Sequence, residues 1–128
     1  MRLGYIILYV PDVAAAVGFY EQAFGLTRRF IDDSVTYGEM ETGGTALSFV
    51  NEDFATANGH HFRPTRAGTL APGVEIALVT DDVAAAFAHA VGAGAQAQQS
   101  PAEKPWGQTV AYVRDLNGFL VELCSPMG

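Results

Sequence analysis

Two stretches of this chain decide the fold, because the second repeats the pattern of the first. LGYIILYVPDVAAAVGFYEQAFG spans residues 3–25, and GVEIALVTDDVAAAFAHAVGAGA spans residues 73–95. A shift of 70 positions places the run Asp-Val-Ala-Ala-Ala that begins at Asp12 on the identical run that begins at Asp82. Such self-similarity indicates two copies of one supersecondary unit. The alternative is two unrelated amphipathic units that are both rich in alanine.

Each copy begins with a strand and continues as a helix. Residues 3–10 are β-branched and aromatic with period two, which is typical of a strand. Asp12 is a natural N-cap, and apolar residues then recur at helical spacing until Gly25 closes the helix. In the second copy a strand over 73–80 precedes a helix that ends near Val91.

Three extended segments follow each helix, so the order β-α-β-β-β occurs twice. They are 26–31, 35–41 and 45–50 in the first half, and 95–99, 108–114 and 119–124 in the second. Residues 100–107 read as a loop, and 51–72 show no clear period. The sequence predicts one domain made of a module over 1–50, a connector over 51–72 and a module over 73–128. The fold class is α+β, with two βαβββ modules that form a curved mixed sheet around a cleft and with the helices outside.

The predicted cleft follows from how little one module can cover. Its helix packs on one face of its sheet and leaves the other face open, so two modules brought together enclose a hollow between their open faces. Because side chains alternate along a strand, Glu75, Ala77 and Val79 share one face of theirs. Equivalent positions of the two halves then converge on one pocket.

Charge and composition exclude several classes of partner. The net charge is −7 with only seven basic residues, whereas nucleic acids and anionic membrane surfaces require a basic face. No apolar run reaches the roughly 18–20 residues of a membrane span, and the N-terminus lacks the pattern of a signal peptide. We therefore expect no nucleic acid and no membrane as partners. An acidic protein can attract a cationic small molecule.

The single cysteine, Cys124, points to the compartment. One cysteine excludes any intrachain disulfide and suits a reducing cytoplasm. Because Cys124 lies in a predicted strand, we expect an inert, packed thiol in a cytoplasmic protein.

Two motifs resemble a known superfamily. YIILYVPDVAAAVGFYEQAFGL (5–26) is similar to the opening module of the vicinal oxygen chelate superfamily, and WGQTVAYVRDLNGFLVEL (106–123) to its closing hairpin. That superfamily includes glyoxalase I, extradiol dioxygenases and the bleomycin-resistance proteins, and the last are the most similar in style. The resemblance covers nearly the whole chain apart from 51–72. It implies paired βαβββ modules and a homodimer.

The resemblance also implies four ligand positions. Metal-using members place His, Glu or Gln on the first and the last strand of each module, and these positions correspond to Tyr5, Ser48, Glu75 and Glu122. None of the four is histidine. Two carboxylates are a weak site for Zn²⁺, Ni²⁺ or Fe²⁺, although Mg²⁺ could use them with water. We expect no cofactor, with a divalent metal at Glu75 and Glu122 as the alternative.

The three histidines offer little help to such a site. His60 and His61 lie in the connector, either as a solvated pair or in a loop that folds over the cleft and donates one imidazole. His89 lies on the second helix, which packs on the opposite side of its sheet from the cleft, so we expect a surface residue.

Two acids in an apolar cleft cannot both ionise cheaply. Without a positive partner, one of Glu75 and Glu122 should have a raised pKa. A cationic ligand or a metal could supply the charge, or the pair could be structural and hydrogen-bond to Tyr5, Ser48 or an arginine. The predicted ligand-binding residues are Tyr5, Ser48, Phe49, Glu75, Trp106, Tyr112 and Glu122.

The sequence thus favours a small-molecule-binding protein of the glyoxalase and bleomycin-resistance type. It would hold an apolar ligand that is cationic or rich in amides in an acidic cleft, without metal and without chemistry, as an antibiotic-resistance protein does. The alternative is a metal-dependent lyase, isomerase or dioxygenase with an atypical ligand set. No catalytic residue is assigned.

Overall fold

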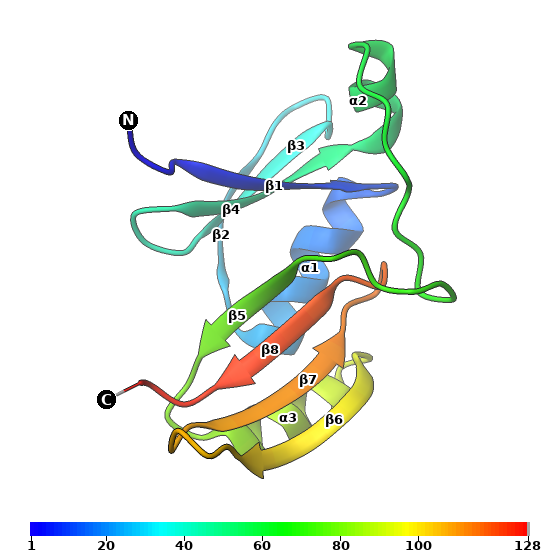
Figure 1. Cartoon of the computed structure of the whole chain (residues 1–128). Coiled ribbons are helices and arrows are strands. Elements are labelled where there is room, and N and C mark those ends of the chain that lie inside the picture. The colour runs from blue at the N-terminus through cyan, green and yellow to red at the C-terminus, as the bar shows by residue number, and fades with distance from the viewer. Residues whose placement is uncertain (128) are drawn as a thin grey trace. The chain divides into compact units, whose positions relative to one another are not determined.

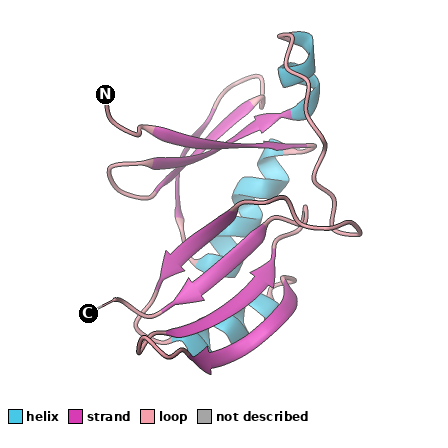
Figure 2. Cartoon of the chain, viewed as in Figure 1, coloured by secondary structure: helices cyan, strands magenta, loops and turns pink. Residues whose placement is uncertain are grey.

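The structure, a computed structural model, describes residues 1–127 and divides into two compact units. One unit is Met1–Pro64 and the other begins at Thr65 (Figure 1). Each unit is a four-stranded mixed sheet with a long helix between its first and second strands, as Figure 2 shows by secondary structure. The predicted α+β class with two βαβββ modules is confirmed. We call the units the first and the second module.

The helices and strands lie close to the predicted ranges. The first module contains β1 (Tyr5–Val10), α1 (Val13–Phe24), β2 (Thr27–Ile31), β3 (Tyr37–Glu41), β4 (Ala46–Asn51) and the short helix α2 (Glu52–Ala57). The second module contains β5 (Glu75–Val79), α3 (Val83–Gly92), β6 (Gln96–Glu103), β7 (Thr109–Arg114) and β8 (Leu120–Cys124). No helix within residues 1–127 combines the length and the apolar character that crossing a membrane requires.

Two segments differ from the prediction. The strand β6 continues to Glu103, through a stretch predicted as loop from residue 100. It tolerates Pro101 because it is an edge strand whose pairing with β7 shifts register between Gln99 and Ala102. The connector, predicted to be irregular, begins with α2, because the Asn51 side chain caps that helix by accepting a hydrogen bond from the backbone N–H of Phe54 at 3.0 Å.

The sequence repeat is reproduced in the helix caps. The Asp12 carboxylate accepts a hydrogen bond from the backbone N–H of Ala15 at 3.0 Å, and the Asp82 carboxylate accepts one from Ala85 at 3.0 Å. The left-handed backbone of Gly25, with a φ of 67°, ends α1 as predicted. Equivalent residues therefore start both helices at equivalent points after β1 and β5.

The two sheets have the same strand order and the same register. The order is β1-β4-β3-β2 in the first module and β5-β8-β7-β6 in the second. The first strand pairs in parallel with the last, so Ile7 lies opposite Ser48 and Ala77 lies opposite Glu122. Ser48 and Glu122 are thus equivalent positions in the two sheets.

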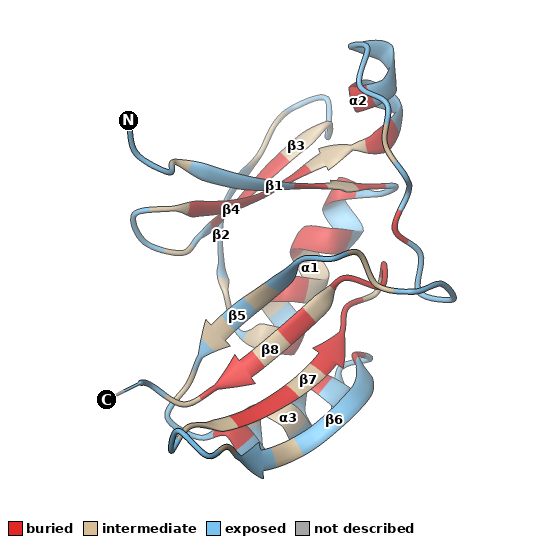
Figure 3. Ribbon diagram, in the orientation of Figure 1, coloured by how far each residue is buried: buried red, intermediate tan, exposed pale blue. Residues whose placement is uncertain are grey.

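Each helix packs on one face of its own sheet. In the first module Phe49 is fully buried, and its ring centroid lies 5.1 Å from that of Tyr20 on α1. Gly38 brings α1 close, because a Cβ there would lie 2.8 Å from a methyl group of Val17. Figure 3 shows β7 and β8 largely buried and β5 and β6 more exposed. We call the sheet face away from the helix the open face of each module.

A buried arginine ties the end of the connector to the second module. The Arg114 guanidinium donates to the backbone carbonyl of Gly118 at 2.9 and 3.0 Å, and to those of Ala67 and Arg66 at 3.3 and 3.4 Å. Arg114 is 8% exposed. Because these carbonyls lie in two separate segments, one side chain fixes both the β7–β8 turn and the chain that enters the module.

Candidate ligand-binding site

The open face of the second module carries the predicted acid pair. Glu75 starts β5 and Glu122 lies in β8 opposite Ala77, so both carboxyl groups lie on this face. The pKa of Glu75 is raised, first by a hydrogen-bonding interaction with the Glu122 side chain, then by partial burial and by the negative charge of Glu122. The direction agrees with the predicted rise in the pKa of one acid of the pair. Two negative charges on these neighbouring carboxyl groups are therefore unfavourable.

Tyr112 completes this group from the neighbouring strand. Tyr112 lies opposite Glu122 in the register of β7 and β8, and its hydroxyl donates to Glu122 Oε1 at 3.1 Å. Burial, followed by this hydrogen bond, raises the pKa of Tyr112 to about 12. Burial also raises the pKa of Cys124, which is buried as predicted. The phenol is thus a neutral donor, and the thiol is not activated as a nucleophile.

No positive side chain neutralises the pair. Within residues 1–127, no lysine, arginine or histidine forms an ion pair with Glu75 or Glu122. The neighbouring positions on the same face are apolar, namely Ala77 and Val79 on β5 and Leu120 on β8, and Val79 is 66% exposed. The second module therefore presents two acids and a phenol on an apolar surface open to solvent.

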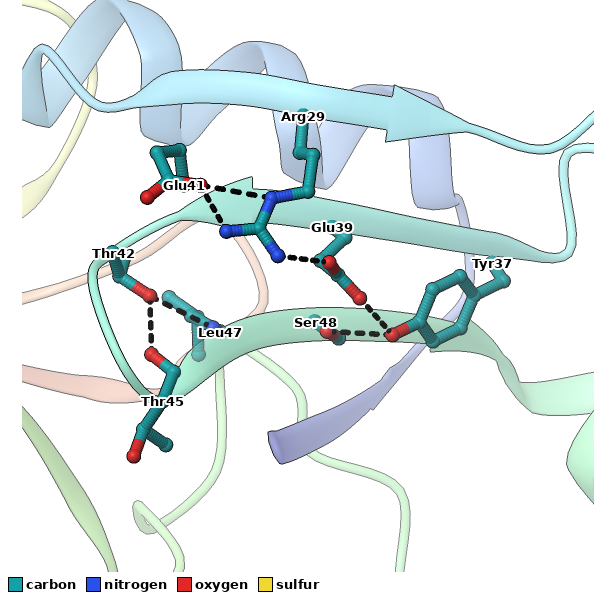
Figure 4. Close-up of polar contacts among 8 residues, drawn as sticks. All are labelled: Arg29, Tyr37, Glu39, Glu41, Thr42, Thr45, Leu47 and Ser48. Atoms are coloured by element: carbon teal, nitrogen blue, oxygen red, sulfur yellow. Dashed lines mark hydrogen bonds and ion pairs between the residues drawn. The ribbon is translucent and has the colours of Figure 1, made fainter. Parts of the chain in front are cut away.

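The first module carries a carboxylate that has its own cation. Glu39 on β3 is 5% exposed; its carboxylate accepts from Arg29 Nη1 at 2.7 Å and from the Tyr37 hydroxyl at 2.6 Å (Figure 4). The Tyr37 hydroxyl also lies 2.9 Å from Ser48 Oγ. The same Arg29 guanidinium forms an ion pair with Glu41. Because Arg29 is internal to the module, the buried charge of Glu39 is already matched.

Register relates these two groups. Glu39 lies opposite Ser48 just as Tyr112 lies opposite Glu122, and a tyrosine–glutamate hydrogen bond occurs on both open faces. In the first module both partners lie on β3, whereas in the second they lie on β7 and β8. Burial, then the bond to Glu39, raises the pKa of Tyr37, as burial and Glu122 do for Tyr112. The difference between the modules is the ion pair: Arg29 pairs with Glu39, whereas the Arg114 guanidinium of the second module donates to backbone carbonyls.

The structure places the other predicted residues as follows. Tyr5 lies on the open face of the first module and is 58% exposed, and Ser48 is fully buried there against Tyr37. Trp106 is 64% exposed in the turn before β7, where its Nε1 donates to Gln108 Oε1 at 2.9 Å.

Phe49 does not lie on the open face, because neighbouring residues of a strand point to opposite sides and the Ser48 side chain points to the open face. The prediction of Phe49 as a lining residue is corrected: it packs against α1.

Sequence reasoning missed the Arg29 group. Its neighbour Arg28 only pairs with Glu21 at the surface. The signal that could have found Glu39 is the alternation of Tyr37, Glu39 and Glu41, which places the three side chains on one face of β3.

The connector brings one histidine to the open side of the first module. His60 lies with its ring centroid 6.3 Å from that of Tyr9, which alternates with Tyr5 and Ile7 on β1. His61 is exposed, and so is His89 on α3, as predicted.

The family assignment agrees with this architecture. The family model described as the Glyoxalase/Bleomycin resistance protein/Dioxygenase superfamily matches residues 2–123. The chain belongs to this superfamily. No curated protein matches the chain.

Solved structures of the superfamily share the fold. A glyoxalase-related enzyme from Fulvimarina pelagi has a TM-score of 0.81 at 22% identity, over 98% of this chain and 88% of the other. TioX from Micromonospora sp. ML1 has a TM-score of 0.72 at 24% identity, over 98% of both chains. A glyoxalase/bleomycin resistance protein/dioxygenase family enzyme from Burkholderia phytofirmans PsJN has a TM-score of 0.77 at 18% identity, over 98% of both chains.

Many members of the superfamily use a metal, but the residues at its four ligand positions do not fit one. The positions that the resemblance implies hold a tyrosine, a serine and two glutamates, with no histidine among them. Transition metals prefer three or four nitrogen, oxygen or sulfur ligands in a compact set. Across residues 1–127, no cluster of three or more histidine, cysteine or acidic side chains is arranged to hold a metal ion. We derive no reaction step that passes through a metal.

The acid pair makes a testable contribution to stability. Because the folded-state pKa of Glu75 is raised, its contribution is fully present below the ordinary glutamate pKa and is lost as pH rises through the raised value. Glu75→Gln removes the repulsion at neutral pH, so the melting temperature at pH 7 should rise. The gain should be at most about 1 kcal/mol, because solvent screens this exposed carboxyl. Thermal unfolding of both proteins between pH 4 and pH 8 should show the gain vanish in acid, and a gain independent of pH would contradict the raised pKa of Glu75.

Proposed function

We propose that this protein binds a small apolar cation on the open face of its second module. The observation that carries the proposal is the contrast between the two acidic groups. Glu39 has Arg29 as its cation, whereas Glu75 and Glu122 have none among residues 1–127. A buried or half-buried carboxylate is stabilised by a positive partner. A ligand ammonium or guanidinium group would supply what the second module lacks.

The surroundings of the pair support a ligand that is apolar beyond its charge. Val79 and Leu120 offer aliphatic contacts beside the carboxyls, and the Tyr112 ring offers an aromatic surface that attracts cations. Such a cation would offset the repulsion between the two carboxylates, and the Tyr112 hydroxyl would go on donating to Glu122. The protein then binds without chemistry on the ligand. A homodimer in the cytoplasm remains part of the proposal, since members of the superfamily commonly dimerise.

A pair of ligands that differ only in charge tests the proposal. Phenylbutylamine and phenylbutanol have nearly the same shape, and only the amine is positive at pH 7. In isothermal titration calorimetry the amine should bind at least about tenfold more tightly than the alcohol, a difference of about 1.4 kcal/mol. In Glu122→Gln this preference should fall, because the variant removes one of the two carboxylates and keeps the shape.

Glu103→Gln is the matched control. Glu103 is an exposed acid at the end of β6, so its loss changes the net charge equally and leaves the pair intact. The preference for the amine should survive in this variant. Equal binding of amine and alcohol by the natural protein, or an equal loss in both variants, would refute the cation site.

A further inference from the structure

The first module has a pocket that the acid pair does not explain. Its volume is about 470 Å³, within the range of roughly 300–1,000 Å³ typical of sites for small molecules. Its floor is formed by Ile7 and Tyr9 of β1 and by Val50 of β4. Its other wall comes from the connector, with Phe54 on α2 and the residues that follow that helix. The pocket therefore lies wholly within the first module.

Several hydrogen bonds fix the connector wall. The Asn51 side chain that caps α2 also donates to the carbonyl of Pro11 at 3.1 Å, which ties the helix to the end of β1. After α2, the Asn58 side chain donates to the carbonyl of Phe54 at 2.9 Å. Gly59, with a φ of 90°, then turns the chain back so that the backbone N–H of His60 bonds to the carbonyl of Ala55 at 3.1 Å. The wall is thus built in advance of any ligand.

Three of the seven lining residues, Tyr9, Phe54 and His60, carry aromatic rings. The ring centroids of Tyr9 and His60 lie 6.3 Å apart. Phe62 also packs edge-on against the Tyr9 ring, with 4.9 Å between the centroids. Phe54 is 47% exposed and Ile7 is 45% exposed, so two large apolar side chains at this pocket stay half open to water. An aromatic occupant could bury both and meet the rings of Tyr9 and His60 in offset or edge contacts.

The lining contains no charged carboxylate, lysine or arginine, and its polar groups are Asn58 and His60 at the connector side. In a chain with a net charge of −7 this makes the pocket an uncharged site. We propose that the pocket binds a neutral aromatic small molecule, with Phe54 and Ile7 against its ring and with Asn58 or His60 at its polar edge. This site belongs to the first module and differs in chemistry from the proposed cation site of the second, and it does not rest on that proposal.

A neutral fluorescent probe tests the pocket. Phenylnaphthylamine carries no charge at pH 7 and brightens in apolar surroundings. Titration of the full chain should give saturable binding of one probe per chain. Phe54→Ala should weaken binding by about tenfold, because it removes a wall. Ile7→Glu should abolish binding, because it places a charge beside the ring. Both residues are half exposed, so neither variant should disturb folding.

Phe30→Ala is the control, because Phe30 is an exposed phenylalanine of the same module, 43% exposed, outside the pocket. The Phe30→Ala variant should bind the probe as tightly as the natural chain does. In both proteins the bound probe should shift the NMR signals of the His60 ring, because His60 lines the pocket. Absence of saturable binding, or equal weakening in Phe30→Ala and Phe54→Ala, would overturn the proposal. The proposal would also be overturned if the natural chain sedimented as a dimer, Phe54→Ala sedimented as a monomer, and neither bound the probe. The pocket would then be part of an interface between two copies of the chain.

Discussion

Phe49→Ala should lower the free energy of unfolding by roughly 3–5 kcal/mol, which is the usual cost of deleting a buried phenylalanine side chain. Phe49 is fully buried between the first sheet and α1, where its ring packs on that of Tyr20. Met40 and Val17 are also fully buried in this core, so little can move in to fill the space. The loss would appear as a lower midpoint in urea denaturation followed by circular dichroism.

Phe30→Ala is again the comparison that isolates burial. Phe30 is 43% exposed and touches the ring of Tyr37 at the surface of the same sheet, so its loss should cost about 1 kcal/mol or less. At urea concentrations where Phe49→Ala remains folded, it should still prefer phenylbutylamine to phenylbutanol. Equal destabilisation by the two variants would contradict the burial of Phe49 against α1, and loss of that preference in folded Phe49→Ala would contradict its purely structural role.

The case of Phe49 shows what strand alternation can and cannot decide. Ser48 and Phe49 are neighbours in one strand, so period two already forbids both from lining one face. The same rule, applied to Glu75 from the repeat and to Glu122 from the closing motif, predicts two acids on one face, and the register of β5 and β8 places them on one face. Position along a regular strand was therefore predictable wherever the alternation was applied strictly.

The fold was predictable because the repeat and its caps are local signals. Asp12 and Asp82 start helices in their own neighbourhoods, and no distant residue is needed to interpret them. The ion pair between Arg29 and Glu39 is different, because it joins two strands across a register shift between Arg28 and Phe30 that interrupts the alternation. The pocket in the first module was also not predicted from the sequence, because α2, which forms one wall, has only six residues and leaves almost no periodic signal.

Gly118→Ala should lower the free energy of unfolding by roughly 2–5 kcal/mol. Gly118 has a φ of 99°, and a left-handed backbone costs a residue with a Cβ roughly 1–2 kcal/mol. Its Cβ would also lie 2.5 Å from the carbonyl oxygen of Arg66 and 2.7 Å from a guanidinium nitrogen of Arg114. Overpacking of this kind costs roughly 1–3 kcal/mol more, because backbone and a buried arginine must shift together.

Gly25→Ala separates the two costs. Gly25 has a φ of 67°, but no atom lies within 4 Å of the Cβ position, so only the cost of the left-handed backbone applies and roughly 1–2 kcal/mol should be lost. The clash at Gly118 should also weaken the hydrogen bonds from Arg114 to Arg66 and Ala67. Trypsin should then cut after Arg66 faster in Gly118→Ala than in Gly25→Ala, at urea concentrations that give equal fractions folded. Equal stability and equal cleavage in the two variants would mean that the β7–β8 turn does not hold the connector.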